Sequence, residues 1–175
     1  MLSNFTLLHD RCVECFGYKF YGTAWQPEFG DYAFRLARGE LCRKAYEAIP
    51  DDTDVLVTHT PCVGYGDYCK GHLGCVDLLH RVLQVKPKYH LFGHIHEGYS
   101  VTTSESKLSL PKHALPAFVM IICNFFGVLF WLCVCCFFVS DSSTVFVNSS
   151  LLDEDYRLRN LPIVFDLPSK QQDGK

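Results

Sequence analysis

The stretch Tyr89–Ser100, YHLFGHIHEGYS, is a short apolar run that ends in glycine and is followed by His94 and His96. An earlier apolar run, Val55–Thr58, ends in the same way at His59. In α/β proteins, functional side chains gather where parallel strands end. Imidazole is also the commonest metal ligand in proteins. The two strand ends therefore predict part of a metal site that uses three histidines.

The spacing of His94 and His96 determines what they can bind. In an extended backbone, residues two apart point to the same side, so both rings can face one pocket and each can bind a different metal ion. Two ions about 3.5–4 Å apart can clamp a phosphoryl group and activate a water molecule. A structural alternative is that His59 only ends a strand and the other two lie in a polar loop. We favour the metal site because the three occur together and Gly93 permits close backbone approach.

The remaining sequence predicts an α/β arrangement. A β-hairpin is expected at Glu14–Thr23, where aromatic and β-branched residues flank a glycine. Helices are expected at Arg38–Ile49 and Cys75–Val85, the second lying between strands Asp54–Thr58 and Lys88–Phe92. The apolar positions at helical spacing are Leu41, Ala45, Ala48 and Ile49 in the first helix, and Val76, Leu79 and Leu83 in the second. Two further strands are predicted at Thr144–Asn148 and Ile163–Asp166.

Composition narrows the class of protein. A chain of 175 residues is normally one domain, and with 20% charged and 14% aromatic residues it is not expected to be disordered. The net charge of −3 comes without a basic cluster, so no nucleic-acid partner is expected. The N-terminus is too short and polar for a signal peptide, which favours a cytoplasmic protein with reduced thiols. Cys12 and Cys15 lack the second pair that a zinc site needs, so we interpret them as strand residues.

Five motifs carry a resemblance to a known family. FYGTAWQPEFGDYAF, VTHTPCVGYGD, GCVDLL, GHIHEGY and NLPIVFDLP together resemble the calcineurin-like metallophosphoesterases, and most closely the metallophosphoesterase domain-containing branch. The resemblance extends over His9–Ser106 and Thr144–Pro168. It implies an α/β fold, specifically an α+β two-sheet β-sandwich flanked by helices, with a dinuclear centre at the strand ends. It also implies divalent Mn, Fe or Zn and a small phosphoester or nucleotide as substrate.

The resemblance assigns a role to each histidine, and departures from the family pattern limit what the chain can do. His59 and His94 correspond to ligands of the second metal, and His96 corresponds to a ligand of the first. The family's Asp-x-His pair, its bridging Asp and its Asn-His pair, which supplies the general acid, are not found. Thr60 and Cys62 also replace a glycine and a proline beside His59. We therefore expect the C-terminal half of the domain, with at most one weakly held ion and little or no activity.

An apolar segment interrupts the resemblance. Ala114–Ser140 has no charged residue and is long enough to cross a bilayer as a helix. The family has a short turn here between two strands of one sheet, and a real membrane span would separate those strands. The segment is also rich in residues that pyrimidine-rich codons encode, so we favour a retained intron or gene-model error over a functional helix. The alternative is a non-catalytic remnant of the fold that a single-pass helix attaches to a membrane.

These expectations divide the chain into four parts. Residues 1–106 and 144–168 are expected to form the metallophosphoesterase portion, with 107–143 as the apolar insert and 169–175 as a tail. The insert is expected to be dispensable for folding, because a longer loop at a turn adds little closure entropy.

Overall fold

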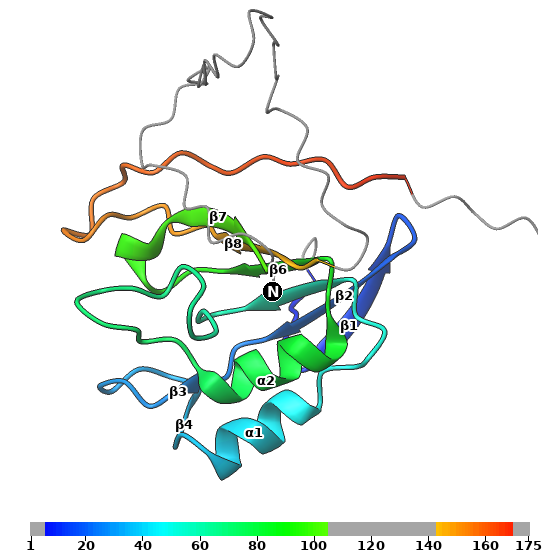
Figure 1. Cartoon of the computed structure of the whole chain (residues 1–175), viewed down its shortest axis with the longest axis horizontal. Coiled ribbons are helices and arrows are strands. Elements are labelled where there is room, and N and C mark those ends of the chain that lie inside the picture. The colour runs from blue at the N-terminus through cyan, green and yellow to red at the C-terminus, as the bar shows by residue number, and fades with distance from the viewer. Residues whose placement is uncertain (1–5, 105–142, 170–175) are drawn as a thin grey trace, which may run out of the picture.

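The computed structural model describes residues 6–104 and 143–169, which form a mixed α/β unit. Its main layer is a six-stranded sheet, and helices α1 (Glu40–Glu47) and α2 (Val76–Val85) lie side by side on one face of it (Figure 1). A second, two-stranded sheet pairs β3 (Gln26–Pro27) with β4 (Arg35–Leu36). The α/β class predicted from the sequence is therefore confirmed. The large second sheet of a β-sandwich is not found among the described residues.

The six-stranded sheet has a parallel centre and antiparallel edges. Its strand order is β1-β2-β5-β6-β8-β7. The four central strands β2, β5, β6 and β8 are parallel to one another, and the edge strands β1 and β7 are antiparallel to β2 and β8. The strand bounds are β1 Arg11–Cys15, β2 Tyr18–Thr23, β5 Val55–Thr58, β6 Tyr89–Phe92, β7 Ser100–Thr103 and β8 Val145–Asn148. Because parallel strands run in the same direction, their carboxyl ends lie along one edge of the sheet.

The unit β5–α2–β6 confirms the strand, helix and strand predicted around the histidines. Val55 of β5 lies opposite Tyr89 of β6, so the two strands run in register to His59 and Gly93. α2 ends where Lys86 takes a left-handed conformation, with φ of 52°, and Pro87 follows directly. A left-handed residue followed by proline is a common way to end a helix, because proline cannot continue the hydrogen-bond pattern.

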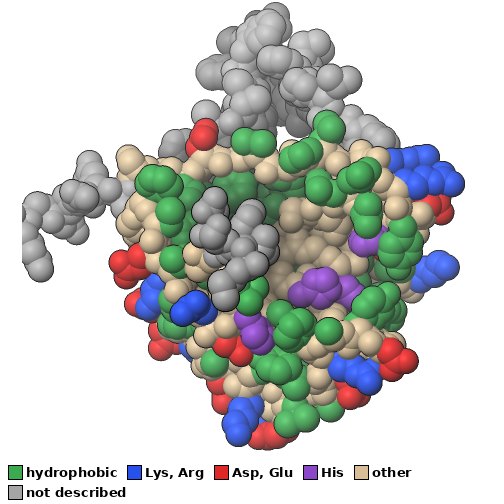
Figure 2. Space-filling model, turned by 180° about the vertical axis from the view of Figure 1, so that it is seen from behind, with side chains coloured by type: hydrophobic (Ala, Val, Ile, Leu, Met, Phe, Trp, Pro, Cys, Tyr) green, Lys and Arg blue, Asp and Glu red, His purple; other side chains and the backbone are tan. Residues whose placement is uncertain are grey.

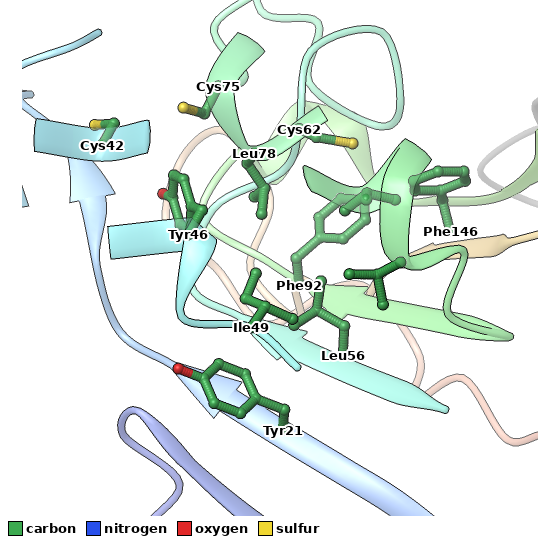
Figure 3. Close-up of a cluster of buried hydrophobic side chains, with 12 residues drawn as sticks. Tyr21, Cys42, Tyr46, Ile49, Leu56, Cys62, Cys75, Leu78, Phe92 and Phe146 are labelled. Carbon is green, nitrogen blue, oxygen red and sulfur yellow. The ribbon is translucent and has the colours of Figure 1, made fainter. Parts of the chain in front are cut away.

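The core lies between the helices and the sheet (Figure 3). It contains buried side chains from both helices and from the strands beneath them: Tyr21, Cys42, Tyr46, Ile49, Leu56, Cys62, Cys75, Leu78, Val82, Val85, Phe92 and Phe146. The Tyr46 hydroxyl donates to the backbone oxygen of Trp25 at 3.0 Å, which satisfies the one polar atom of a fully buried ring. This core fixes the position of β5, which leads to His59.

The predicted buried faces of the helices were only partly right: Ile49 is buried and Leu79 packs against the core, but other predicted positions are exposed. In α2, Leu78, Val82 and Val85 are buried, whereas Val76 and Leu83 are 46% and 51% exposed. In α1 and the turn after it, Cys42, Tyr46 and Ile49 are buried, and Leu41 is 51% exposed. Each helix carries apolar residues on more than one side, so spacing alone left the face ambiguous. The helix face that packs against the sheet is the one that becomes buried.

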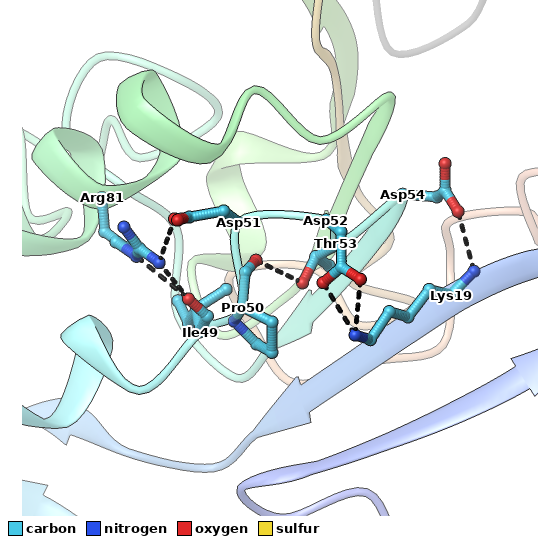
Figure 4. A network of polar contacts seen from close by, with 8 residues as sticks. All are labelled: Lys19, Ile49, Pro50, Asp51, Asp52, Thr53, Asp54 and Arg81. Carbon is cyan, nitrogen blue, oxygen red and sulfur yellow. Dashed lines mark hydrogen bonds and ion pairs between the residues drawn. The ribbon is translucent and has the colours of Figure 1, made fainter.

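A network of polar contacts fixes the turn between α1 and β5 (Figure 4). Arg81 of α2 donates from Nε to the Ile49 backbone oxygen at 3.1 Å and forms an ion pair with Asp51 at 2.7 Å. On the other side, the Lys19 backbone N–H donates to Asp54 Oδ2 at 2.8 Å. Both helices and strand β2 therefore contact the turn that leads into β5.

The strand predicted at Ile163–Asp166 is not formed. Residues 151–169 run along the side of the sheet away from the helices without joining a ladder (Figure 1). Tyrosine hydroxyls bind their carbonyls instead: Tyr99 donates to Leu161 at 2.7 Å, and Tyr18 donates to Pro168. The segment also stacks Phe165 on Tyr89, with ring centroids 5.0 Å apart. Side-chain contacts with the sheet thus hold this segment, and the predicted strand does not form.

The apolar insert of residues 107–143 lies almost wholly outside the described residues, so the predicted helix within 114–140 remains a prediction. Within 6–104 and 143–169, no helix is long and apolar enough to cross a membrane. The strands on either side of the insert, β7 and β8, pair antiparallel, with Thr103 opposite Val145. They are thus neighbours in one sheet, as the resemblance implied.

Candidate metal centre

His59 and His94 lie together at the carboxyl ends of β5 and β6. Their ring centroids are 4.8 Å apart, with the ring planes tilted by 55°. The backbone N–H of Gly93 donates to the His59 carbonyl oxygen at 3.1 Å, so the ladder between the two strands continues up to the histidines. Figure 2 shows histidine side chains gathered on and beside a hollow in one face of the molecule. The sequence prediction that these two residues meet is consistent with this geometry.

His94 has a left-handed backbone conformation, with φ of 70°. Non-glycine residues rarely adopt this conformation, and they do so mostly where surrounding contacts impose it. Two aromatic rings approach His94 edge-on: Phe29 at 5.8 Å and Tyr32 at 6.2 Å between centroids. Phe29 and Tyr32 are about half exposed and stack on each other. They form an accessible aromatic rim beside His94.

His96 is held separately from the other two histidines. Its Nδ1 lies 2.9 Å from the backbone oxygen of Asp153, and its ring lies 5.0 Å from that of Tyr156, between centroids. A carbonyl oxygen can only accept, so this contact assigns the proton to Nδ1 and leaves Nε2 with its lone pair. A backbone carbonyl in this position is the usual way to orient a histidine ligand.

Partial desolvation favours the neutral form of both histidines. It lowers the pKa of His94 to about 4, with smaller contributions from the charges of His59 and His96. Burial also lowers the pKa of His59, although that side chain still reaches solvent. Neutral imidazoles present lone pairs at physiological pH, so no proton must leave before either ring binds a metal ion. The donor chemistry of the pair therefore fits a divalent cation.

A buried asparagine fixes the loop that carries His94 and His96. Asn148, at the end of β8, donates from Nδ2 to the carbonyl oxygens of Gly66 and Ile95, both at 2.8 Å. The loop packs tightly enough that a Cβ built on Gly98 would lie 2.0 Å from the Gly66 oxygen. The loop after β6, the loop after β5 and the end of β8 are thus joined at one point beneath the histidines.

A second buried group, His90, supports the end of β5 from within the core. Its Nε2 is 2.9 Å from the Thr58 hydroxyl, which itself donates to the Thr60 carbonyl at 2.7 Å. Since the hydroxyl has a single proton, Nε2 of His90 must be the donor to it. Burial lowers the pKa of His90 to about 3. His90 is therefore a neutral structural group under the residue that precedes His59.

The three histidines do not converge on one point. Among the described residues, His, Cys, Asp and Glu ligand atoms come together within 4.8 Å in sets of three or more only at Cys42, Cys75 and Asp77. His59 and His94 form a pair by their ring contact, and His96 does not complete a compact set of three with them. The assignment of His94 and His96 to different ions stays a prediction. Sequence reasoning missed the Asp153 carbonyl and the ring of Tyr156, because these lie far along the chain in a segment with no site motif.

Comparisons with known proteins find several curated relatives, although no protein-family model matches the chain. The chain is 36% identical over 171 residues to a Caenorhabditis elegans UPF0046 protein, a match that covers 96% of the chain and 34% of the relative. It is 32% identical over 173 residues to human metallophosphoesterase domain-containing protein 1, covering 97% and 42%. A second C. elegans UPF0046 protein is 35% identical over 175 residues, covering 96% and 49%.

The chain has an α/β fold, and these matches show that it is similar to proteins named for a metallophosphoesterase domain. It is a relative of the metallophosphoesterase domain-containing proteins, and the resemblance predicted from its motifs is confirmed. The chain spans between about a third and a half of the length of these curated relatives.

Proposed function

We propose that this chain supplies the histidine ligands of a metal centre that hydrolyses small phosphoesters. His59 and His94 would bind one divalent ion, and His96 would bind another through Nε2. The single observation that carries the proposal is the pairing of His59 and His94, with ring centroids 4.8 Å apart at the ends of adjacent parallel strands. The relationship to metallophosphoesterase domain-containing proteins supports the same chemistry.

Residues of the chain would orient the metal ligands and border the substrate. A divalent ion at such a site polarises a phosphoryl oxygen and lowers the pKa of a water molecule. The Asp153 carbonyl holds the His96 ring so that Nε2 is the free nitrogen. Phe29 and Tyr32 border His94 with exposed aromatic surface, against which the organic part of a phosphoester can lie. The backbone hydrogen bond between Gly93 and His59 keeps the strand ends that carry the two imidazoles next to each other.

The small number of metal ligands limits the metal binding and catalysis that this chain can achieve by itself. Hydrolytic metal sites need a defined, open coordination shell, and carboxylates usually complete it and balance the charge. In the described part of the chain, no carboxylate joins the histidines in a compact set of three ligands. We therefore infer that the chain binds at most one ion at His59 and His94, weakly, with little or no turnover by itself.

Metal titration tests the proposal. The full chain, titrated with Mn²⁺ in a calorimeter, should bind about one ion weakly, and His94→Ala should abolish this binding. His80→Ala is the matched control, because His80 is an exposed histidine on α2, away from the site. Equal binding by wild type and His94→Ala would overturn the metal site.

Turnover provides the second measurement. With a p-nitrophenyl phosphodiester and Mn²⁺, the chain should release little or no product. Robust turnover that disappears in His94→Ala would keep the metal site and overturn the inferred inactivity. The two experiments therefore separate metal binding from catalysis.

A further inference from the structure

A second set of metal-ligand side chains lies between the two helices, away from the histidines. Cys42 is in the first turn of α1, Cys75 is the N-cap of α2, and Asp77 is in the first turn of α2. One ligand atom from each of these side chains comes within 4.8 Å of the others. Both cysteines are fully buried, with 0% of their surface exposed, and both are free thiols. Figure 3 shows the two cysteines at neighbouring ends of the helices.

We propose that Cys42, Cys75 and Asp77 bind a thiophilic divalent cation, for which Zn²⁺ is the best match, and that the ion clamps the N-terminal ends of α1 and α2 together. Zinc takes cysteine sulfur and carboxylate oxygen in tetrahedral sites. With Zn–S bonds of about 2.3 Å, the sulfur atoms of a tetrahedral site are about 3.8 Å apart. The printed separation within the set, 4.0 Å between Cys75 Sγ and Asp77 Oδ2, is close to this tetrahedral edge, and all three ligand atoms lie within 4.8 Å of one another.

The surrounding backbone offers a fourth ligand and an anchor. The Leu36 carbonyl oxygen is 3.6 Å from Cys42 Sγ, a separation that suits two ligands of one zinc ion. Asp77 Oδ2 is 4.0 Å from Cys75 Sγ and accepts a hydrogen bond from the Gly39 N–H at 3.1 Å. Gly39 is the N-cap of α1, so Asp77 already links the starts of both helices. An ion bound there would strengthen an existing contact.

Binding of a divalent ion at this cluster would leave its net charge unchanged. Burial raises the pKa of Cys42 to about 12 and is also the main cause that raises the pKa of Cys75, so both thiols hold their protons until an ion replaces them. When M²⁺ enters, the two thiols form two S–M bonds and release two protons to water. The net charge of the cluster thus stays at −1, the charge of Asp77. The Arg38 guanidinium, which binds the Gly74 and Leu73 carbonyls beside Cys75, lies near enough to offset it.

The clamp would also stabilise the loop that carries His59. Cys75 donates its N–H to the Pro61 oxygen at 3.1 Å and accepts from the Val63 N–H at 3.2 Å. Gly74 packs against Cys62, where an added Cβ would lie 2.5 Å from the Cys62 backbone. An ion on Cys75 therefore acts on the segment that begins two residues after His59, although it does not touch the histidine.

Cobalt substitution tests the site on the reduced full chain, because Co²⁺ bound to thiolate gives a near-ultraviolet charge-transfer band that histidine ligands do not give. Wild type should show this band at about one equivalent of Co²⁺, and Zn²⁺ should displace it. Asp77→Asn should weaken binding by about tenfold or more. The amide of this variant keeps an oxygen for the Gly39 N–H, so the fold is preserved. Cys42→Ser should remove the band.

Controls separate this site from the two exposed thiols of strand β1 and from the histidines. A Cys12→Ser and Cys15→Ser double variant, which changes two exposed cysteines, should keep the band, and so should His94→Ala. Zn²⁺ should raise the thermal unfolding midpoint of wild type and leave that of Asp77→Asn unchanged. No sulfur-to-cobalt band in the folded wild type, a band that survives in Cys42→Ser, or a Cys42–Cys75 disulfide that forms in place of metal binding would each overturn the proposal.

Discussion

The backbone N–H of Gly93 donates a hydrogen bond of 3.1 Å to the carbonyl oxygen of His59. This bond extends the β5–β6 ladder beyond both strands, to the residues that bear the candidate ligands. The position of the histidine pair therefore depends on the packing of two parallel strands and on the loops that follow them. Substitutions that loosen these loops should affect the site without changing a ligand.

Gly98→Ala tests how tightly the loop after β6 is packed. A Cβ at this position would lie 2.0 Å from the Gly66 carbonyl oxygen, and neither backbone can move freely. We expect the free energy of unfolding to fall by about 1–3 kcal/mol, measured by urea denaturation. Gly71→Ala is the matched control, because no atom lies within 4 Å of its added Cβ. Equal stability of the two variants would contradict the close packing of Gly98 on Gly66.

Asn148→Asp removes the amide that joins the two loops. The carboxylate cannot donate, so the carbonyl oxygens of Gly66 and Ile95 lose the Asn148 amide, a fully buried donor, although the Ile95 oxygen still accepts from the Gly98 N–H. An unpaired buried polar group costs about 1–3 kcal/mol, and we expect a loss of stability of that size. Hydrogen exchange at the Gly98 N–H, which donates to the Ile95 oxygen, should become faster.

The control for Asn148 is Asn160→Asp, the same change in a less buried residue. Asn160 also donates to two carbonyl oxygens, those of Ser150 and Leu152. This variant should lose less stability and leave exchange at Gly98 unchanged. If both variants accelerate exchange at Gly98 equally, Asn148 has no special role in fixing the histidine loop.

Arg81→Ala should destabilise the protein more than Lys19→Ala. The Arg81 side chain is 15% exposed and donates to the Ile49 carbonyl near the end of α1, a contact that water replaces poorly. We expect Arg81→Ala to lower the free energy of unfolding by about 1.5–3 kcal/mol. Lys19 pairs with Asp52 at the surface, where solvent weakens the interaction, and its backbone bonds to Asp54 survive the substitution. Chemical denaturation of both variants would refute this order if Lys19→Ala lost as much.

The sequence predicted the positions of the strands and helices better than it predicted which face of each helix is buried. Strands β5 and β6 and helix α2 are marked by apolar runs, by Pro87 and by the histidines that follow each strand, so local pattern was sufficient. The buried stripe of α2 was misassigned, because Val76 and Leu83 are as apolar as Leu78 and Val82. Only the position of the sheet decides between two apolar faces of one helix.

For the candidate sites too, the sequence predicted contacts between neighbouring strands but not contacts that depend on tertiary packing. His59 and His94 could be predicted to meet, because adjacent parallel strands end at one edge of the sheet. The contact between His96 and the Asp153 oxygen joins residues 57 apart, across a segment without any motif. The cluster of Cys42, Cys75 and Asp77 likewise depends on how two helices pack, which no spacing within either helix encodes.

His90 should make stability depend on pH. Its folded pKa of about 3 is lower than the ordinary value of 6.5, so the unfolded chain takes up the proton first as pH falls. The stability that the neutral form contributes is complete above about pH 6.5 and is lost progressively between about pH 6.5 and 3. The loss from this residue approaches about 1.4 kcal/mol per pH unit in the middle of that range.

His90→Gln removes this dependence while keeping a group that can donate to the Thr58 hydroxyl. Urea unfolding between about pH 4 and 7.5 should show a steeper acid-side fall in stability for wild type than for His90→Gln. Part of the slope should remain in the variant, because burial also lowers the pKa of His94, to about 4. His80→Gln, at an exposed position on α2, controls for the loss of an imidazole. Identical slopes for wild type and His90→Gln would show that His90 is protonated, or reaches water, in the folded protein.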